Sequence, residues 1–237
     1  MAKRASKSAS SPPAVTAPPD TTPPPPATLD VSTMTWPRDT PLHRVHLEQY
    51  AGNEFNPGVK GNARFSPIRN ARDEPIPTLY GGDTFECAAM ETVFHDVPFA
   101  PGLKSYDKAK LNDQVHSQIT PGDDLVLADL RSKALRKLGV QRKQLIDTEK
   151  DQYPVTRQWA EAIHAQRPDV QGVCWTSRQD DSAQAVMLFG DRIASGVLQQ
   201  IAPSRSLLND SSAYDDVLNL ADQIGVNIVP GSATGRS

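Results

Sequence analysis

The prolines of this chain are concentrated in its first segment. Eight of the 21 prolines lie within residues 1–30, and four of these form the run from Pro23 to Pro26. Proline has no backbone N–H and a fixed φ angle, so this density prevents a helix or an internal sheet strand. We therefore predict a disordered Pro/Ser-rich tail over residues 1–33, one folded domain over residues 34–230 and a flexible end over residues 231–237.

Charge and cysteine content exclude several classes of protein. The 25 basic and 28 acidic residues give a formal charge of −3, so we expect no nucleic-acid partner, which would need a basic surface. No run of about 18 apolar residues is present, so no membrane partner is expected. Cys87 and Cys174 lie in apolar stretches, which is typical of buried free thiols in a reducing compartment, and we expect a cytoplasmic protein. The spacing of His and Cys predicts no metal site.

The order of the expected elements favours an α+β domain. Apolar patterns predict strands over residues 42–47, 124–130, 172–177, 185–189 and 226–229. Helices are expected from Asp83 onward, with Glu86 as capping partner, and over residues 132–138, 154–166 and 215–224. Residues 98–123 are expected to be irregular or weakly helical. Because these elements follow no strict βαβ rhythm, a doubly wound sheet is disfavoured.

Four polar residues stand where strands and helices meet loops. Arg44 lies inside a short apolar strand and Arg64 precedes Phe65 in a loop. Glu91 borders an apolar helix face, and Ser177 ends a strand. Each of these alone is more often a salt bridge or a cap than a catalytic group. The chain also has no nucleophile elbow, no P-loop and no glycine-rich dinucleotide motif.

Taken together, these positions resemble the RES-domain family, which is named for an arginine, a glutamate and a serine. The resemblance covers most of residues 36–200. The matching segments are, in order, Leu42-His43-Arg44, Gly61-Asn62-Ala63-Arg64-Phe65, Thr78-Leu79-Tyr80 with Ala88-Ala89-Met90-Glu91, Tyr153-Pro154 with Thr156 and Trp159-Ala160, and Trp175-Thr176-Ser177-Arg178 with Val186 to Phe189.

This resemblance implies an ADP-ribosyltransferase-like fold and an enzyme of transferase type that acts on NAD without a metal. It implies catalytic roles for Glu91, Arg44 and Ser177, and NAD binding by Arg44, Arg64, Tyr80 and Ser177. Guanidinium groups suit the pyrophosphate, and a carboxylate suits the cation that develops when the nicotinamide–ribose bond breaks. An aromatic ring such as Tyr80 suits stacking on nicotinamide.

The resemblance leaves the acceptor open. Inorganic phosphate would make the chain an NAD phosphorylase, with Arg178 as a further candidate phosphate ligand, whereas a protein side chain would make it a mono-ADP-ribosyltransferase. A RES-like binding module without activity, or an unrelated α+β protein that matches by chance, are the other hypotheses. Many members are toxins of toxin–antitoxin pairs, so a cognate antitoxin is an implied partner and a homodimer stays open.

Overall fold

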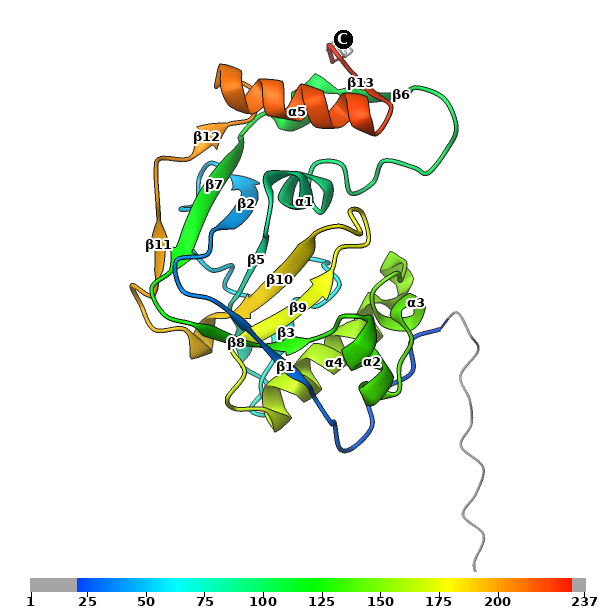
Figure 1. Cartoon of the computed structure of the whole chain (residues 1–237), viewed down its shortest axis with the longest axis vertical. Coiled ribbons are helices and arrows are strands. Elements are labelled where there is room, and N and C mark those ends of the chain that lie inside the picture. The colour runs from blue at the N-terminus through cyan, green and yellow to red at the C-terminus, as the bar shows by residue number, and fades with distance from the viewer. Residues whose placement is uncertain (1–20, 232–237) are drawn as a thin grey trace, which may run out of the picture.

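A mixed sheet runs through the centre of the molecule (Figure 1). The computed structural model describes residues 21–231, so the predictions for residues 1–20 and 232–237 lie outside the described residues. Within them, the main sheet has nine strands, in the order β1 (Thr33–Trp36), β8 (Leu125–Asp129), β9 (Gly172–Thr176), β10 (Gln184–Phe189), β5 (Thr78–Gly82), β2 (Leu42–Leu47), β7 (Gln114–Pro121) and β11 (Leu198–Gln200), with β12 (Arg205–Ser206) also on β7.

The pairing of these strands confirms the predicted α+β class. Every neighbouring pair in the main sheet is antiparallel except β8 and β9. Strand β10 lies between β9 and β5, and its apolar run from Ala185 to Phe189 is buried. Gly172 on β9 lies so close to β10 that a Cβ atom there would sit 2.4 Å from the carbonyl oxygen of Met187. The centre of the sheet is therefore tightly packed.

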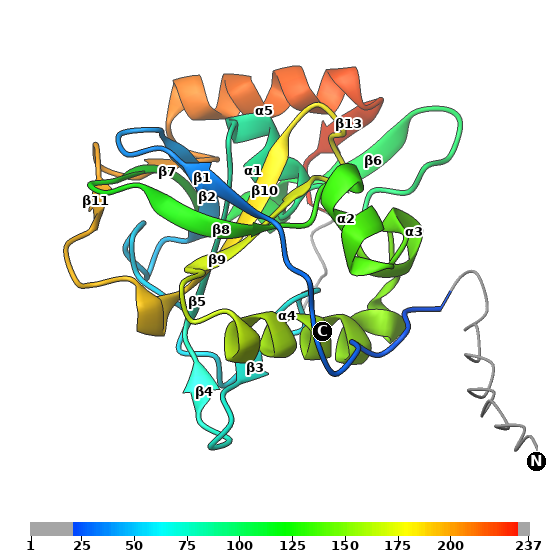
Figure 2. The same cartoon turned by 60° about the horizontal axis from the view of Figure 1, so that its bottom comes forward.

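Helices cover the sheet from two sides. Figure 2 shows α5 above the sheet and α4 below it. The helices are α1 (Phe85–Met90), α2 (Ser132–Leu138), α3 (Arg142–Leu145), α4 (Tyr153–Gln166) and α5 (Ser211–Gln223), with short 3-10 turns at Lys108–Leu111, Lys150–Gln152 and Gly190–Arg192. Two small sheets complete the domain, β6 (Lys104–Asp107) with β13 (Val226–Val229) and β3 (Ile68–Arg69) with β4 (Pro75–Ile76). None of the helices of residues 21–231 is long and apolar enough to cross a membrane.

The segment before β1 corrects the predicted tail boundary. Residues 21–32, which we call the strap, lie in extended form beside α4 and bury Leu29 and Val31. The indole N–H of Trp159 donates to the carbonyl oxygen of Pro23 at 2.7 Å. Proline lacks only the amide donor, so a proline-rich segment can still be held through its carbonyl groups.

Two local predictions were also wrong. Helix α1 begins one residue later than expected, because the side chain of Thr84, and not that of Asp83, accepts the amide of Cys87 at 3.0 Å. Residues 98–123, expected to be irregular or weakly helical, contain β6 and the eight-residue strand β7. The polar residues of β7 do not show the apolar pattern of a buried strand. They are buried all the same, because His116 and Ser117 have hydrogen-bond partners on β2 and β12.

One such group is the histidine pair between β2 and β7, in which His116 is buried and His43 is half-buried. The Nη2 atom of Arg205 donates to Nδ1 of His116 at 3.1 Å, so Nδ1 is unprotonated. Nε2 of His116 then carries the proton and donates to Nδ1 of His43 at 3.0 Å, with the two rings stacked. Burial, together with the neighbouring His43 and Arg205, lowers the pKa of His116 to about 3.

This pair predicts an acid-side loss of stability. The unfolded chain protonates His116 near its ordinary pKa of 6.5, whereas the folded chain does so only near 3. The unfolded state therefore binds more protons between these values, and the free energy of unfolding falls as the pH drops through that window. We expect His116→Gln, which keeps an acceptor and a donor, to show a shallower fall in melting temperature between pH 7 and 5 than wild type. Equal slopes for the two proteins would contradict the assignment.

Candidate active site

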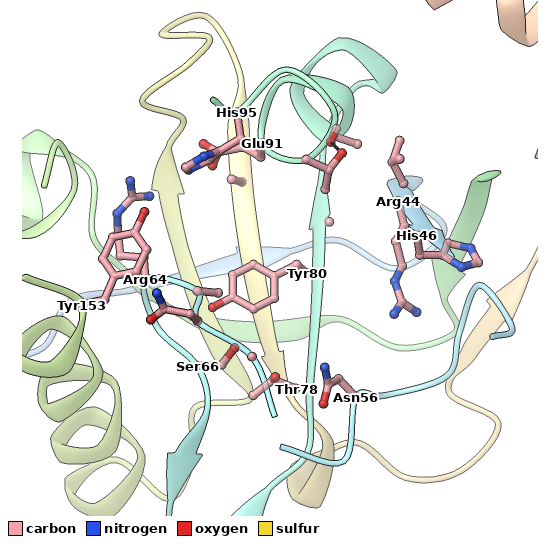
Figure 3. Close-up of a pocket in the computed structure, with 18 of the residues that line it drawn as sticks. Arg44, His46, Asn56, Arg64, Ser66, Thr78, Tyr80, Glu91, His95 and Tyr153 are labelled. Carbon is pink, nitrogen blue, oxygen red and sulfur yellow. Dashed lines mark hydrogen bonds between the residues drawn. The ribbon is translucent and has the colours of Figure 1, made fainter. Parts of the chain in front are cut away.

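A cavity of about 410 Å³ opens on the sheet between α1, the start of α4 and the loop before β3. Four of the five residues predicted from the sequence line it, namely Arg44, Arg64, Tyr80 and Glu91. Figure 3 shows Tyr80 between the two arginines, with Glu91 near His95 at the rim formed by the end of α1. The fifth residue, Ser177, does not line this cavity but bonds to Glu91, which does.

Arg64 is the most informative residue of the cavity. Its side chain is only 4% exposed, yet its Nε and Nη2 atoms have no hydrogen-bond partner among the described residues. Its guanidinium carbon lies 5.7 Å from the ring centre of Tyr153. A buried charged donor without an acceptor destabilises the protein by several kcal/mol unless an anion binds it. Arg64 therefore offers the cavity two charged N–H donors that no described residue uses.

The backbone of Arg64 is fixed by α4. The hydroxyl of Thr156 donates to the carbonyl oxygen of Arg64. Nε of Arg157 donates to the carbonyl oxygen of Ala63 at 3.1 Å, and its Nη2 atom bonds to the side chain of Asn62. Helix α4 thus holds the loop that carries Arg64 at three consecutive residues.

Arg44 has a different environment. Its Nη1 atom donates to the carbonyl oxygens of Gly52 and Glu54, both at 2.7 Å, and so holds the loop that follows β2. Burial lowers its pKa to about 10, which leaves it cationic at neutral pH. Arg44 and Arg64 lie on opposite sides of Tyr80 (Figure 3), so they face different parts of the cavity.

Glu91 and Ser177 are joined by a short side-chain hydrogen bond. Glu91 caps the end of α1, and Ser177 follows β9. The hydroxyl of Ser177 donates to Oε1 of Glu91 at 2.6 Å and accepts the amides of Gln179 and Asp180 at 3.0 and 3.1 Å. Ser177 is fully buried, and these bonds use its one proton and both lone pairs. Ser177 therefore contacts the carboxylate of Glu91 in this structure, and its contact with a ligand stays a prediction.

Tyr80 forms the floor of the cavity. Its hydroxyl accepts the amide of Phe65 at 3.2 Å, and its ring packs edge-on against Trp175. Burial raises the pKa of Tyr80 to about 12, so the ring stays neutral. The indole Nε1 atom of Trp175, whose side chain also lines the cavity, has no partner within residues 21–231. The floor thus combines an aromatic surface with an unused donor.

The sequence of this chain matches the model of the RES domain over residues 41–209, which is well over half of its length. The chain belongs to the RES domain family. All five predicted site residues lie inside the matched range, whereas the strap lies before it. No curated protein matches the sequence.

Among solved structures, this RES domain is similar to a chain in the crystal structure of the M. tuberculosis MbcT–MbcA toxin–antitoxin complex. The TM-score is 0.55 at 15% sequence identity, and the match covers 78% of this chain and 90% of that chain. At this level of identity the likeness supports the fold alone.

The cavity is also lined by residues that the sequence did not single out as site residues. Tyr153, at the start of α4, is buried against Arg64 and lines the cavity. Asp96 and Lys150 form an ion pair at 2.8 Å on the cavity rim, and His95 bonds to Asp96 at 2.8 Å. The hydrogen bond from Lys150 lowers the pKa of Asp96 to about 2. Tyr153 belongs to one of the segments that resemble the RES-domain family. No sequence signal links Asp96 to Lys150, which is 54 residues away.

Arg178 does not reach this cavity. Its Nη1 atom donates to the carbonyl oxygen of Thr148 at 2.7 Å, and its Nη2 atom pairs with Glu149. It lines a second cavity of about 310 Å³, which shares three wall residues with the first, His95, Asp96 and Lys150. Arg178 therefore lies apart from the four predicted site residues that line the first cavity.

Both cysteines are buried within the domain, one on α1 and the other on β9. Cys87 and Cys174 are buried free cysteines, and burial raises the pKa of both thiols, that of Cys174 to about 12. They are therefore protonated and poorly nucleophilic. Within the same residues, no cluster of three or more His, Cys, Asp or Glu side chains is placed to hold a metal ion.

Proposed function

We propose that this RES domain is an enzyme that cleaves the nicotinamide–ribose bond of NAD, with inorganic phosphate as acceptor. The observation that carries the proposal is the unpartnered, buried guanidinium of Arg64 in the cavity that Glu91 also lines. A dinucleotide such as NAD has a diphosphate that Arg64 can bind and a glycosidic bond at which Glu91 can act. The cavity volume of about 410 Å³ falls within the usual range for small-molecule sites.

Each cavity residue has a role in this proposal. Arg64 binds the diphosphate through its Nε and Nη2 donors, because charged N–H groups in a dry pocket form strong bonds to phosphate oxygens. Tyr80 offers a neutral ring on which nicotinamide stacks. Arg44, on the other side of Tyr80, faces the remainder of the dinucleotide.

In the proposed reaction, the bond between the anomeric carbon and the pyridine nitrogen breaks first, and its electron pair leaves with neutral nicotinamide. The ribose becomes an oxocarbenium-like cation, which the carboxylate of Glu91 stabilises. An oxygen of inorganic phosphate then bonds to the anomeric carbon and gives a phosphorylated ADP-ribose. No metal ion takes part in this scheme.

We also propose that the chain is the toxin of a toxin–antitoxin pair. Membership of the RES domain family and the likeness to a chain of a toxin–antitoxin complex support this role. A cognate antitoxin would be a separate protein. Co-expression with the neighbouring reading frame, followed by purification of a complex, tests this part independently of activity.

The acceptor is tested by incubating the full-length protein with NAD, with and without inorganic phosphate, and separating the products by chromatography. We expect nicotinamide release that depends on phosphate, together with a phosphorylated ADP-ribose. Release without phosphate would replace this acceptor with water or a protein side chain, the latter being mono-ADP-ribosylation. A folded sample that consumes no NAD would favour a binding module.

The contact between Ser177 and Glu91 predicts a selective kinetic effect. Ser177→Ala removes the donor that orients the carboxylate but no group that touches the ligand. We expect kcat to fall about tenfold and KM for NAD to stay within about twofold, since one oriented hydrogen bond is worth about 1.4 kcal/mol. Ser182→Ala, an exposed serine in the same turn, serves as the control and should leave kcat unchanged. A rise in KM with constant kcat would assign Ser177 to ligand binding instead.

A further inference from the structure

The strap contacts α4 along nearly its whole length. The amide of Thr22 donates to Oε1 of Gln152 at 3.1 Å, and the amide of Leu29 donates to Oε1 of Gln166 at 2.8 Å. Between them, Trp159 donates to the strap through the bond to Pro23 described above. Trp159 and Gln166 on α4 and the N-cap residue Gln152 just before it are spaced seven residues apart, so they lie close to one line along the helix.

The same helix carries the active-site contacts on another side. Tyr153 underlies the guanidinium of Arg64, and Thr156 and Arg157 hold the backbone of the Arg64 loop. Further along, Oε1 of Glu161 accepts the amide of Arg69 at 2.9 Å. A shift of α4 along or about its axis is therefore expected to move Arg64 relative to Glu91, which caps α1 and has no place on α4.

The strap is well suited to fix this helix. Its prolines restrict the unfolded chain to extended conformations, so ordering the segment loses less conformational entropy than an ordinary loop would. Leu29 and Val31 are buried at 7% and 6% exposure, which adds apolar contact to the hydrogen bonds. The Nη1 atom of Arg167 donates to the carbonyl oxygen of Val31 at 2.7 Å just beyond the end of α4.

We infer that the strap is a positioning element of the active site, which sets the place of Arg64 for the diphosphate by fixing α4. The inference rests on the proposed function in naming a dinucleotide as ligand. The strap lies before the residues that match the RES domain model. Placement of a charged group to within a few tenths of an ångström governs its contribution to binding.

The test replaces Trp159 with Phe in the full-length chain, which removes the donor to Pro23 and keeps an aromatic ring. We expect the dissociation constant for ADP-ribose, measured by calorimetry, to rise about fivefold, which is about 1 kcal/mol. The kcat for NAD should change by less than about twofold, because Glu91 is held by α1 and Ser177. Hydrogen exchange should accelerate in residues 22–32 and in residues 62–66.

Trp36→Phe is a matched control. Trp36 is also buried, at 3% exposure, and its Nε1 atom donates to the carbonyl oxygen of Thr40 at 3.2 Å, but it lies on β1 and does not line the cavity. We expect a similar loss of melting temperature with unchanged ADP-ribose binding. If Trp159→Phe also loses only melting temperature, the strap is merely structural and the inference is wrong.

A second variant acts from the strap itself. Leu29→Ser removes the buried apolar contact of the strap and leaves the sequence of α4 unchanged. We expect the same weakening of ADP-ribose binding. Because both changes release the same segment, the double variant should be little weaker than either single variant. Additive losses would contradict a shared mechanism.

The two proposals fail in different ways. If the wild-type protein does not bind ADP-ribose at all, the proposed function is wrong, and the strap is then judged by hydrogen exchange. Faster hydrogen exchange in residues 62–66 of Trp159→Phe, but not of Trp36→Phe, would still support the inference that the strap fixes the Arg64 loop through α4. Unchanged exchange there would overturn it.

Discussion

Glu91→Gln should lower the turnover of NAD by about 100-fold or more while leaving the fold intact, because removal of one preorganised transition-state contact usually costs that much. The substitution is nearly isosteric, and the amide oxygen can still accept the proton of Ser177. What is lost is the negative charge that faces the developing cation. Since this charge matters mainly in the transition state, we expect kcat to fall and NAD affinity to change little.

The measurement is nicotinamide release by purified wild type and variant at equal concentration, with melting temperature as the test of folding. Glu86→Gln is the matched control, since Glu86 lies exposed on the same helix and lines neither of the two cavities described above. It should retain wild-type turnover. A Glu91→Gln protein with turnover within a few-fold of wild type would remove Glu91 from the mechanism.

Arg64→Gln should have the second large effect, and it should act on binding. Loss of charged hydrogen bonds to a diphosphate costs about 2 kcal/mol or more, so we expect the dissociation constant for NAD to rise about 30-fold. The melting temperature of the ligand-free protein should rise at the same time. Arg64 is a buried cation with unsatisfied donors, and its removal relieves that desolvation cost.

Calorimetric titration with NAD and thermal unfolding measure the two effects on one sample. Arg72→Gln is the control, because Arg72 is exposed in the turn between β3 and β4 and pairs with Glu74. It should change neither quantity. Weaker binding together with a lower melting temperature would mean that Arg64 is a structural residue, and unchanged binding would contradict its phosphate role.

Local sequence signals predicted much of the fold because they act over a few residues. Gly139 ends α2 in the left-handed conformation with a φ of 73°, and Pro154 lies in the first turn of α4, as their residue types indicate. The apolar run of β10 is buried as expected. These elements need no knowledge of their partners.

Strand β7 and the strap could not be predicted in this way, because distant partners decide them. His116 and Ser117 on β7 look like surface residues, yet both are buried, since His43, Arg205, His46 and Ser204 satisfy their polar atoms. The prolines of the strap suggest disorder until Trp159, 136 residues away, is seen to donate to Pro23. A polar strand and a proline-rich segment are both stable when long-range contacts satisfy the backbone and side chains.

The candidate site also has features that the sequence predicts and features that only long-range contacts reveal. Resemblance to the family identified Arg44, Arg64, Tyr80 and Glu91, and these line one cavity. It implied a catalytic role for Arg44 but not for Arg64, and both a catalytic and an NAD-binding role for Ser177. Only the burial of Ser177 and its bond to Glu91 reveal its orienting position.

The most direct test of the account is whether the purified full-length protein, free of any bound inhibitor, releases nicotinamide from NAD. We expect release by wild type that is supported by phosphate and nearly absent in Glu91→Gln, with NAD still bound by that variant in a calorimetric titration. A folded wild-type protein that neither binds NAD nor releases nicotinamide would contradict the assignment of this cavity as an NAD-cleaving site.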